Sequence, residues 1–352
     1  MAQTGAGRPP AAPWSFRLFE VVPLPPVWVG IGLAAALFAV YYGVEYATGQ
    51  IHRVRAGTAE PHIAGHLRSA AINALLFAYL PTAQIYLTRW TRRHVAELQP
   101  LLRPQRGADA QRPEAGSLAS PASRMAGAAG VAMVLAIFVV PSGLGKLTDT
   151  GYWVFEHLWD NGLAVLIGWL VGRFLYAMVA DALYVSRLAE RLATVDLLDP
   201  APLQPFVRQG TRGALLTVVF LTINAGHLGN FVISAPALAV TLPALLALAG
   251  AALVLPLGGV HRRIREEKRV RLAKLRDAIR AGERAALAGG AKAQRAAADL
   301  PGLLALEARL EAVREWPIDA TSVLRVALYV AIGLGSWVGA AGVERLLDRA
   351  LA

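Results

Sequence analysis

Long apolar blocks separated by polar segments dominate the sequence. Seven of these blocks hold at least 20 residues, the length that a helix needs to cross a hydrocarbon layer about 30 Å thick. Strands of a membrane barrel would instead alternate in polarity over about ten residues. The pattern therefore predicts an all-α, polytopic transmembrane helix bundle, with spans at residues 26–47, 69–88, 125–145, 162–184, 213–233, 236–258 and 322–343.

The charges of the connecting segments predict the orientation of the chain. A cytoplasmic N-terminus leaves 27 Arg and Lys residues inside and 6 outside, in agreement with the positive-inside rule. The chain then divides into spans one to six within 1–258, with cytoplasmic loops 89–124 and 185–212, a cytoplasmic segment 259–321, and a seventh span with an outer tail at 322–352. Loop 48–68 is discordant, because it would be external yet carries three arginines, which leaves open whether the first block crosses.

Composition supports a membrane location and excludes several kinds of chemistry. The chain is 55% hydrophobic and 17% charged, whereas soluble domains are nearer a quarter charged. The formal charge of +11 is explained by cytoplasmic loops, so no nucleic-acid partner is expected. A strong bias to Arg over Lys, with abundant Ala and Gly, suggests a GC-rich bacterial genome and hence the inner membrane. No cysteine is present, and no motif calls for a cofactor.

The segment 259–321 predicts a helical hairpin outside the bilayer. Residues 258–282 continue the sixth block as a helix, with Val260, Ile264, Leu272, Leu275 and Ile279 forming an apolar stripe. An Ala- and Gly-rich flexible turn would follow up to Pro301, before a second helix with its own stripe at 303–316. Such narrow stripes require a partner. Pairing of the two helices within the chain is the default expectation, and packing between subunits is the alternative.

Two ionisable residues stand out within the fourth block. Arg173 lies near the middle of this span and Asp181 lies eight residues later, on the same helical face but about 12 Å along the axis. A central arginine costs about 2.5–3.5 kcal/mol on insertion scales, so it must face the bundle interior or a wet cavity. It is interpreted either as a buried structural arginine or as part of an ion or substrate pathway.

The fifth block adds three polar residues at a spacing of three. Asn224, His227 and Asn230 gather on one side of the helix, and with Arg173 and Asp181 they form the predicted intramembrane polar seam. The competing interpretation is ordinary hydrogen bonding between helices.

Short glycine and histidine patterns suggest contacts rather than catalysis. The pairs Gly168/Gly172 and Gly335/Gly339 mark close helix contacts, and these spans or the hairpin are candidates for a homo-oligomer. His62 and His66 are one turn apart behind Glu60, a spacing that can hold zinc. With no third ligand specified, this is a weak candidate, and no metal site and no catalytic residue is predicted.

The segment between the fourth and fifth spans, TVDLLDPAPLQPFVRQGTRGALL at 194–216, carries a distinctive string. Asp196 and Asp199 are expected to set turns, Pro205 to prevent helix formation, and Arg208 and Arg212 to be available to either aspartate. The string resembles one found in a group of functionally uncharacterised bacterial multi-pass membrane proteins, and stretches 316–330 and 336–348 are loosely similar. The resemblance implies a bacterial membrane protein and no particular activity.

Three function classes follow from these features. The first is a channel- or transporter-like passage built on the polar seam. The second is a membrane-embedded scaffold or signalling partner that acts through the hairpin. The third, an intramembrane enzyme, lacks any catalytic constellation and is the least favoured.

Overall fold

The structure is a computed structural model. It describes residues 19, 21–49, 51, 62–102, 120–136, 155–192, 196–199, 201–226, 243, 247–288, 291–317, 321, 323–333 and 335, without the side chains of 62–65 and 291–292. The described residues form helices and no strand, which confirms the all-α class. The named helices are α2 (Pro26–Ala47), α4 (His62–Leu98), α5 (Pro121–Val134), α6 (Phe155–Glu190), α7 (Gln204–Ala225), α9 (Gly258–Leu287) and α10 (Ala291–Glu311), with 3₁₀ turns η1 (Gln99–Leu101), η6 (Ala201–Leu203) and η8 (Leu255–Leu257).

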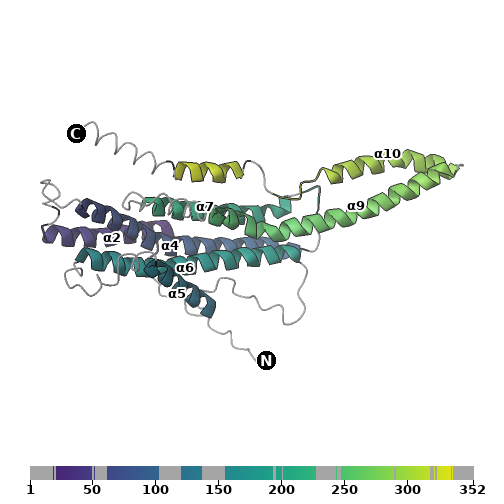
Figure 1. Ribbon diagram of the computed structural model, residues 1–352. Coiled ribbons are helices and arrows are strands. Elements are labelled where there is room, and N and C mark those ends of the chain that lie inside the picture. The colour runs from purple at the N-terminus through teal and green to yellow at the C-terminus, as the bar shows by residue number, and fades with distance from the viewer. Residues whose placement is uncertain are drawn as a thin grey trace, which may run out of the picture.

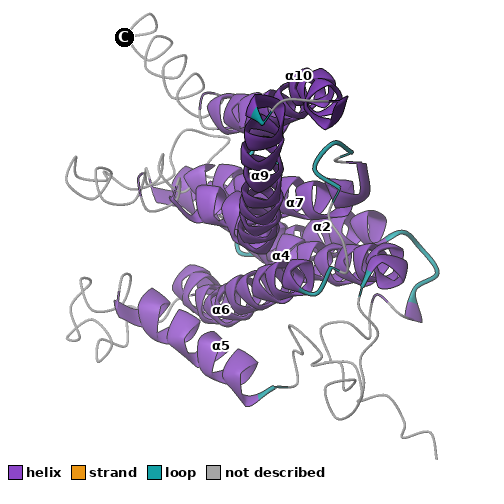
Figure 2. Ribbon diagram, turned by 90° about the vertical axis from the view of Figure 1, so that its right-hand side faces the viewer, coloured by secondary structure: helices purple, strands orange, loops and turns teal. Residues whose placement is uncertain are grey.

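Helices α2, α4, α6 and α7 run side by side as a bundle, and α5 crosses α6 on one side (Figures 1 and 2). Within the described residues, α2, α4 and α6 are long and apolar enough to cross a membrane. The predicted spans at 125–145, 213–233, 236–258 and 322–343 are described only in part, and a shorter apolar helix covers Val323–Gly333. The chain therefore has the helices of a membrane protein.

The surface of α2 shows why this bundle suits lipid. Only 22% of its apolar window is buried inside the protein, and Val27, Trp28, Ile31 and Val40 are all more than 40% exposed. A large apolar surface of this kind is rare on soluble monomers, whereas hydrocarbon chains solvate it without cost. The exposed face of α2 thus indicates contact with the bilayer.

Helix boundaries agree with the sequence for the first block and differ for the second and fourth. Helix α2 begins and ends where the block 26–47 does, but α4 and α6 extend well beyond 69–88 and 162–184. The predicted loop 185–212 is correspondingly shorter, because α6 continues to Glu190 and α7 starts at Gln204. The expectation that Pro205 prevents helix formation is wrong. Pro205 occupies the first turn of α7, where a missing N–H has no partner to lose.

Helix α5 packs against α6 through backbone rather than through side chains. A Cβ atom on Gly172 would lie 2.0 Å from the Ala126 carbonyl oxygen, and one on Gly130 would lie 2.1 Å from the Gly168 carbonyl oxygen. Small residues at these positions let the helices approach this closely. The predicted close contact at Gly168/Gly172 is confirmed, and α5 of the same chain occupies it.

Helices α9 and α10 form an antiparallel hairpin that projects from one end of the bundle (Figure 1). The apolar stripes pair within the chain, as expected by default: Ile264, Leu275 and Leu310 are buried in one cluster, with Leu303 packed against it. The predicted flexible turn up to Pro301 is wrong, because α10 already begins at Ala291 and contains Pro301. Alanine is the best helix former, so the Ala-rich stretch extends the hairpin instead of interrupting it.

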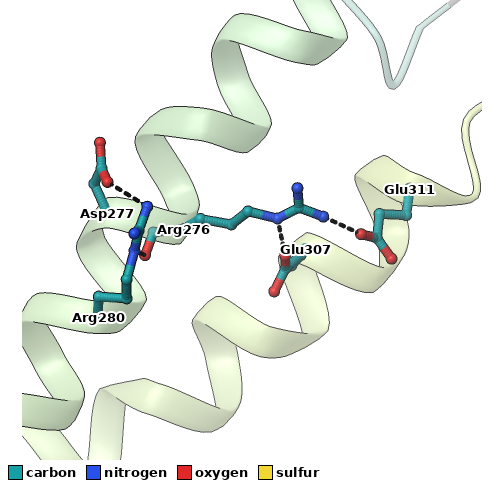
Figure 3. Close-up of polar contacts among 5 residues, drawn as sticks. All are labelled: Arg276, Asp277, Arg280, Glu307 and Glu311. Atoms are coloured by element: carbon teal, nitrogen blue, oxygen red, sulfur yellow. Dashed lines mark hydrogen bonds and ion pairs between the residues drawn. The ribbon is translucent and has the colours of Figure 1, made fainter.

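Charged contacts join the two helices of the hairpin. Arg276 of α9 reaches across to α10, with Nε 2.7 Å from Glu307 and Nη2 2.5 Å from Glu311 (Figure 3). These two hydrogen bonds raise the pKa of the Arg276 guanidinium above its ordinary value. Lower on α9, Lys268 Nζ donates to the carbonyl oxygens of Glu311 and Val313, where the chain leaves α10. Polar contacts thus hold α9 and α10 together at two positions along the hairpin.

A junction core connects the hairpin to the bundle. It is the buried cluster that contains Leu98 at the end of α4, Val185 of α6, Phe206 of α7 and Val260 of α9, all fully buried. A backbone contact reinforces it, since Gly259 N donates to Ser186 Oγ at 2.8 Å. The base of the hairpin is therefore packed into the bundle.

Candidate functional site

A buried carboxylate lies where α4 meets α6. Asp181 is 4% exposed, and its Oδ2 accepts a hydrogen bond from Thr91 Oγ1 at 3.3 Å. No other hydrogen bond to Asp181 is found among the described residues. A carboxylate can accept about four hydrogen bonds, so most of the acceptor capacity of Asp181 is unused by the part of the chain that the structure describes.

Thr91 continues into a chain of hydrogen bonds that joins α4, α6 and α7. Gln209 Nε2 donates to Thr91 Oγ1 at 2.9 Å, His94 Nδ1 lies 2.8 Å from Gln209 Oε1, and Arg212 Nη1 lies 3.0 Å from His94 Nε2. Asp181, Thr91, His94 and Gln209 are each less than 9% exposed. This chain of hydrogen bonds therefore extends through the interior of the bundle.

The donors and acceptors require all hydrogen bonds of this chain to be donated in the same direction. A guanidinium can only donate, so His94 Nε2 must accept from Arg212. The proton of a neutral imidazole then sits on Nδ1 and is donated to Gln209 Oε1, whose amide in turn donates to Thr91. Every dipole consequently points from the Arg212 cation towards the Asp181 carboxylate. Aligned dipoles of this kind polarise one another in a medium of low dielectric constant.

Arg212, at the far end of the hydrogen-bond chain, packs against α4. The Arg212 guanidinium lies 4.9 Å from the centre of the Trp90 ring, a cation–π distance. One turn earlier on α7, Arg208 pairs with Glu97 at 3.2 Å. The expectation that these arginines would serve the loop aspartates is wrong for the described residues.

The two loop aspartates are used by their own backbone. Asp196 Oδ1 accepts from Leu198 N at 2.9 Å, and Asp199 Oδ1 accepts from Ala201 N at 3.0 Å. These hydrogen bonds, two residues apart, are those of an Asx turn. The predicted turns are confirmed, and they explain why the carboxylates do not reach α7.

Arg173 lies in a different contact from Asp181. Its side chain is buried beside α5, where Nε donates to Ser123 Oγ at 3.3 Å, and its guanidinium lies 5.8 Å from the Trp169 ring centre. Its carbonyl oxygen accepts from Gln84 Nε2 of α4 at 3.5 Å. Arg173 thus faces α5 and Asp181 faces Thr91 of α4, so the two do not form one cluster.

The remaining residues of the predicted seam add little to this site. Asn224 donates to the Phe220 carbonyl oxygen of its own helix at 3.0 Å. His227 and Asn230 lie outside the described residues. The structure therefore centres the candidate site on Asp181, and adds Thr91, His94 and Gln209, which the sequence analysis did not select.

A second polar group lies at the opposite end of the bundle. His66 Nδ1 lies 3.2 Å from Asp160 Oδ2, and Asn73 Nδ2 donates to Asp160 Oδ1 at 3.4 Å. Glu60 and the side chain of His62 lie outside the described residues, so the histidine pair is not tested. Within those residues, no group of three or more His, Asp or Glu side chains is placed to hold a metal ion.

Comparison with known proteins gives no match, whether to a family model, a curated protein or a solved structure.

Proposed function

We propose that this chain is a bacterial inner-membrane protein that forms a channel- or transporter-like passage, with Asp181 as its central polar group. The seven-span topology, with the N-terminus inside, is part of this proposal. The passage is supported mainly by Asp181, which is buried in an apolar helix and makes one hydrogen bond, of 3.3 Å, with the described residues. Ionisable groups within spans are expensive and mark ion or substrate pathways by default.

The direction of the hydrogen-bond chain offsets part of the cost that burial imposes on a charged Asp181. The aligned donors from Arg212 to Thr91 present positive ends to the carboxylate, which favours its anion without a direct ion pair. The hydrogen-bond chain itself does not conduct protons. The carbonyl oxygen of the neutral Gln209 amide carries no proton, so Gln209 cannot pass one on to Thr91. In this proposal the hydrogen-bond chain orients and stabilises Asp181. A cation or proton reaches the carboxylate by another route through the bundle.

Cysteine accessibility tests the passage directly, because the chain has no native cysteine. Ala177 is 3% exposed and lies one turn from Asp181 on the same face, whereas Val179 is 36% exposed on the outside of the bundle. In sealed membranes, A177C is expected to react with a charged, membrane-impermeant thiosulfonate at least tenfold faster than V179C. Water in a passage ionises the first thiol, while lipid surrounds the second. Equal protection of both positions would remove the support for a passage.

A scaffold that assembles through the hairpin is the second candidate, and the projection of α9 and α10 from the bundle favours it (Figure 1). The two helices still face each other at Gly282, where an added Cβ would lie 3.8 Å from the Leu300 side chain. Residues 283–299 can therefore be replaced by a short glycine-rich link without disturbing the Arg276 contacts.

This shortened hairpin gives the test of the scaffold. The full chain in detergent is expected to have the mass of an oligomer by light scattering, and the 283–299 variant the mass of a monomer. Insertion into membranes should be unchanged, because the apolar helices are intact. An identical mass for both proteins would count against assembly through the hairpin tip.

A further inference from the structure

A basic groove lies where the hairpin leaves the bundle. It has a volume of about 1050 Å³ and lies along α9, between Glu190 at the end of α6 and Glu315 beyond α10. Three of its lining residues are glutamates and six are cationic. The six cations are Arg262, Arg263, Arg265, Lys268, Arg269 and Arg276.

Four of these cations are held by the protein itself. Arg262 pairs with Glu190 at 2.7 Å, and Arg263 lies 3.5 Å from Glu267. Lys268 is bound to two carbonyl oxygens, and Arg276 pairs with Glu307 and Glu311 at the upper end of the groove (Figure 3). These contacts hold four of the six lining cations in place. The other two are Arg265 and Arg269.

Arg265 and Arg269 are exposed, and neither forms an ion pair or side-chain hydrogen bond with any residue that the structure describes. They are four residues apart, so their side chains are neighbours on one face of α9, where like charges repel. Arg262 and Arg276 continue the same face, at spacings of three and seven residues. Glu266 lines the same groove but forms no ion pair with either arginine among the described residues, so both guanidinium groups are available to a ligand that carries several oxygens and negative charge.

The position of the groove is suited to a phosphate at the membrane surface. Helix α9 begins at Gly258, directly after the apolar residues that end at Leu257. At 1.5 Å per residue, Arg262 and Arg265 lie about 6 and 10 Å beyond Gly258. Lipid headgroups occupy a layer of about 5–8 Å on each side of the hydrocarbon. In the proposed topology Arg262, at the lower end of the groove, is thus at headgroup level, Arg265 lies just above this layer, and the upper end of the groove is in water.

We propose that this groove binds a phosphate group through Arg265 and Arg269, with Arg262 and Arg276 flanking it. The phosphate belongs either to an anionic lipid headgroup or to a soluble polyphosphate. The site requires only the hairpin base and its membrane-proximal position, so it is independent of whether the bundle forms a passage.

Two binding experiments on the full-length protein distinguish the sources of phosphate. In the first, protein in phosphatidylcholine nanodiscs is titrated with inorganic pyrophosphate. In the second, native mass spectrometry counts phosphatidylglycerol retained by the detergent-solubilised protein, against phosphatidylcholine as the neutral reference. The test variant is R265Q/R269Q. The matched control is K274Q/R284Q, which removes two exposed charges from α9 outside the groove.

The double variant is expected to lose about 30-fold in affinity, or the corresponding bound lipid, while the control keeps both. A loss in the pyrophosphate experiment identifies a soluble ligand, and a loss in the lipid experiment identifies a headgroup. R269Q alone should give an intermediate loss, and circular dichroism should show unchanged helicity because both arginines are exposed. The proposal is overturned if neither probe distinguishes the wild type from R265Q/R269Q, or if the control loses as much.

Discussion

Substitution of Gly172 by alanine is expected to force α5 away from α6 and to lower the free energy of unfolding by about 3 kcal/mol. The new methyl group would lie 2.0 Å from the Ala126 carbonyl oxygen, which is backbone and cannot rotate aside. Arg173 is the next residue, and its contact with Ser123 of α5 should be lost with the packing. Unfolding by SDS in mixed micelles measures the change.

Gly162→Ala is the matched control for this prediction. It lies on the same helix, and an added Cβ there meets nothing within 4 Å, so its substitution should be neutral or slightly stabilising. If Gly172→Ala unfolds at the same SDS fraction as Gly162→Ala, the close approach of α5 and α6 is not present in the protein.

Gly259→Ala is expected to have a comparable effect at the base of the hairpin. Its Cβ would lie 1.7 Å from the Ser186 carbonyl oxygen, so α9 must shift from α6 and give up the Gly259–Ser186 hydrogen bond. The junction core would open as a result. Proteolysis of the hairpin in membranes should be accelerated at least tenfold, because local opening exposes the backbone of α9 to protease.

The adjacent residue provides a control for this second prediction. A Cβ on Gly258 would lie 3.7 Å from Ser186 Oγ, an ordinary contact, so Gly258→Ala should leave the protease sensitivity unchanged. Equal sensitivity of the two variants would show that the hairpin base is not packed against α6 as described.

The sequence predicts apolar segments better than helix ends. The block 26–47 coincides with α2, but α4 and α6 extend beyond their blocks because an apolar window stops where lipid would stop, while backbone hydrogen bonding continues. The hairpin shows the same limit. Its apolar stripe at Ile264, Leu275 and Leu310 was predicted and is buried, whereas the start of α10 depends on alanine propensity and not on polarity.

The candidate site could be predicted only in part, for a physical reason. Asp181 was selected because a carboxylate in an apolar helix is unusual in any fold. Its connections were missed because Thr91 and His94 lie about 90 and 115 residues from their partners Asp181 and Gln209. Thr91, His94 and Gln209 also lie just outside the apolar blocks, where polar residues are common. A search for polar residues three apart at block ends would have found Thr91/His94 and Gln209/Arg212.

The location of the chain in a bilayer, with its hairpin on the cytoplasmic side, is tested most directly by labelling single cysteines in sealed vesicles of known orientation. A110C reports on the predicted loop 89–124, and A285C on the exposed end of α9. Both variants should remain in the membrane fraction after an alkaline wash, and a membrane-impermeant maleimide should label both from the cytoplasmic face only. Labelling of the two cysteines from opposite faces, or release of the protein by the wash, would contradict the account.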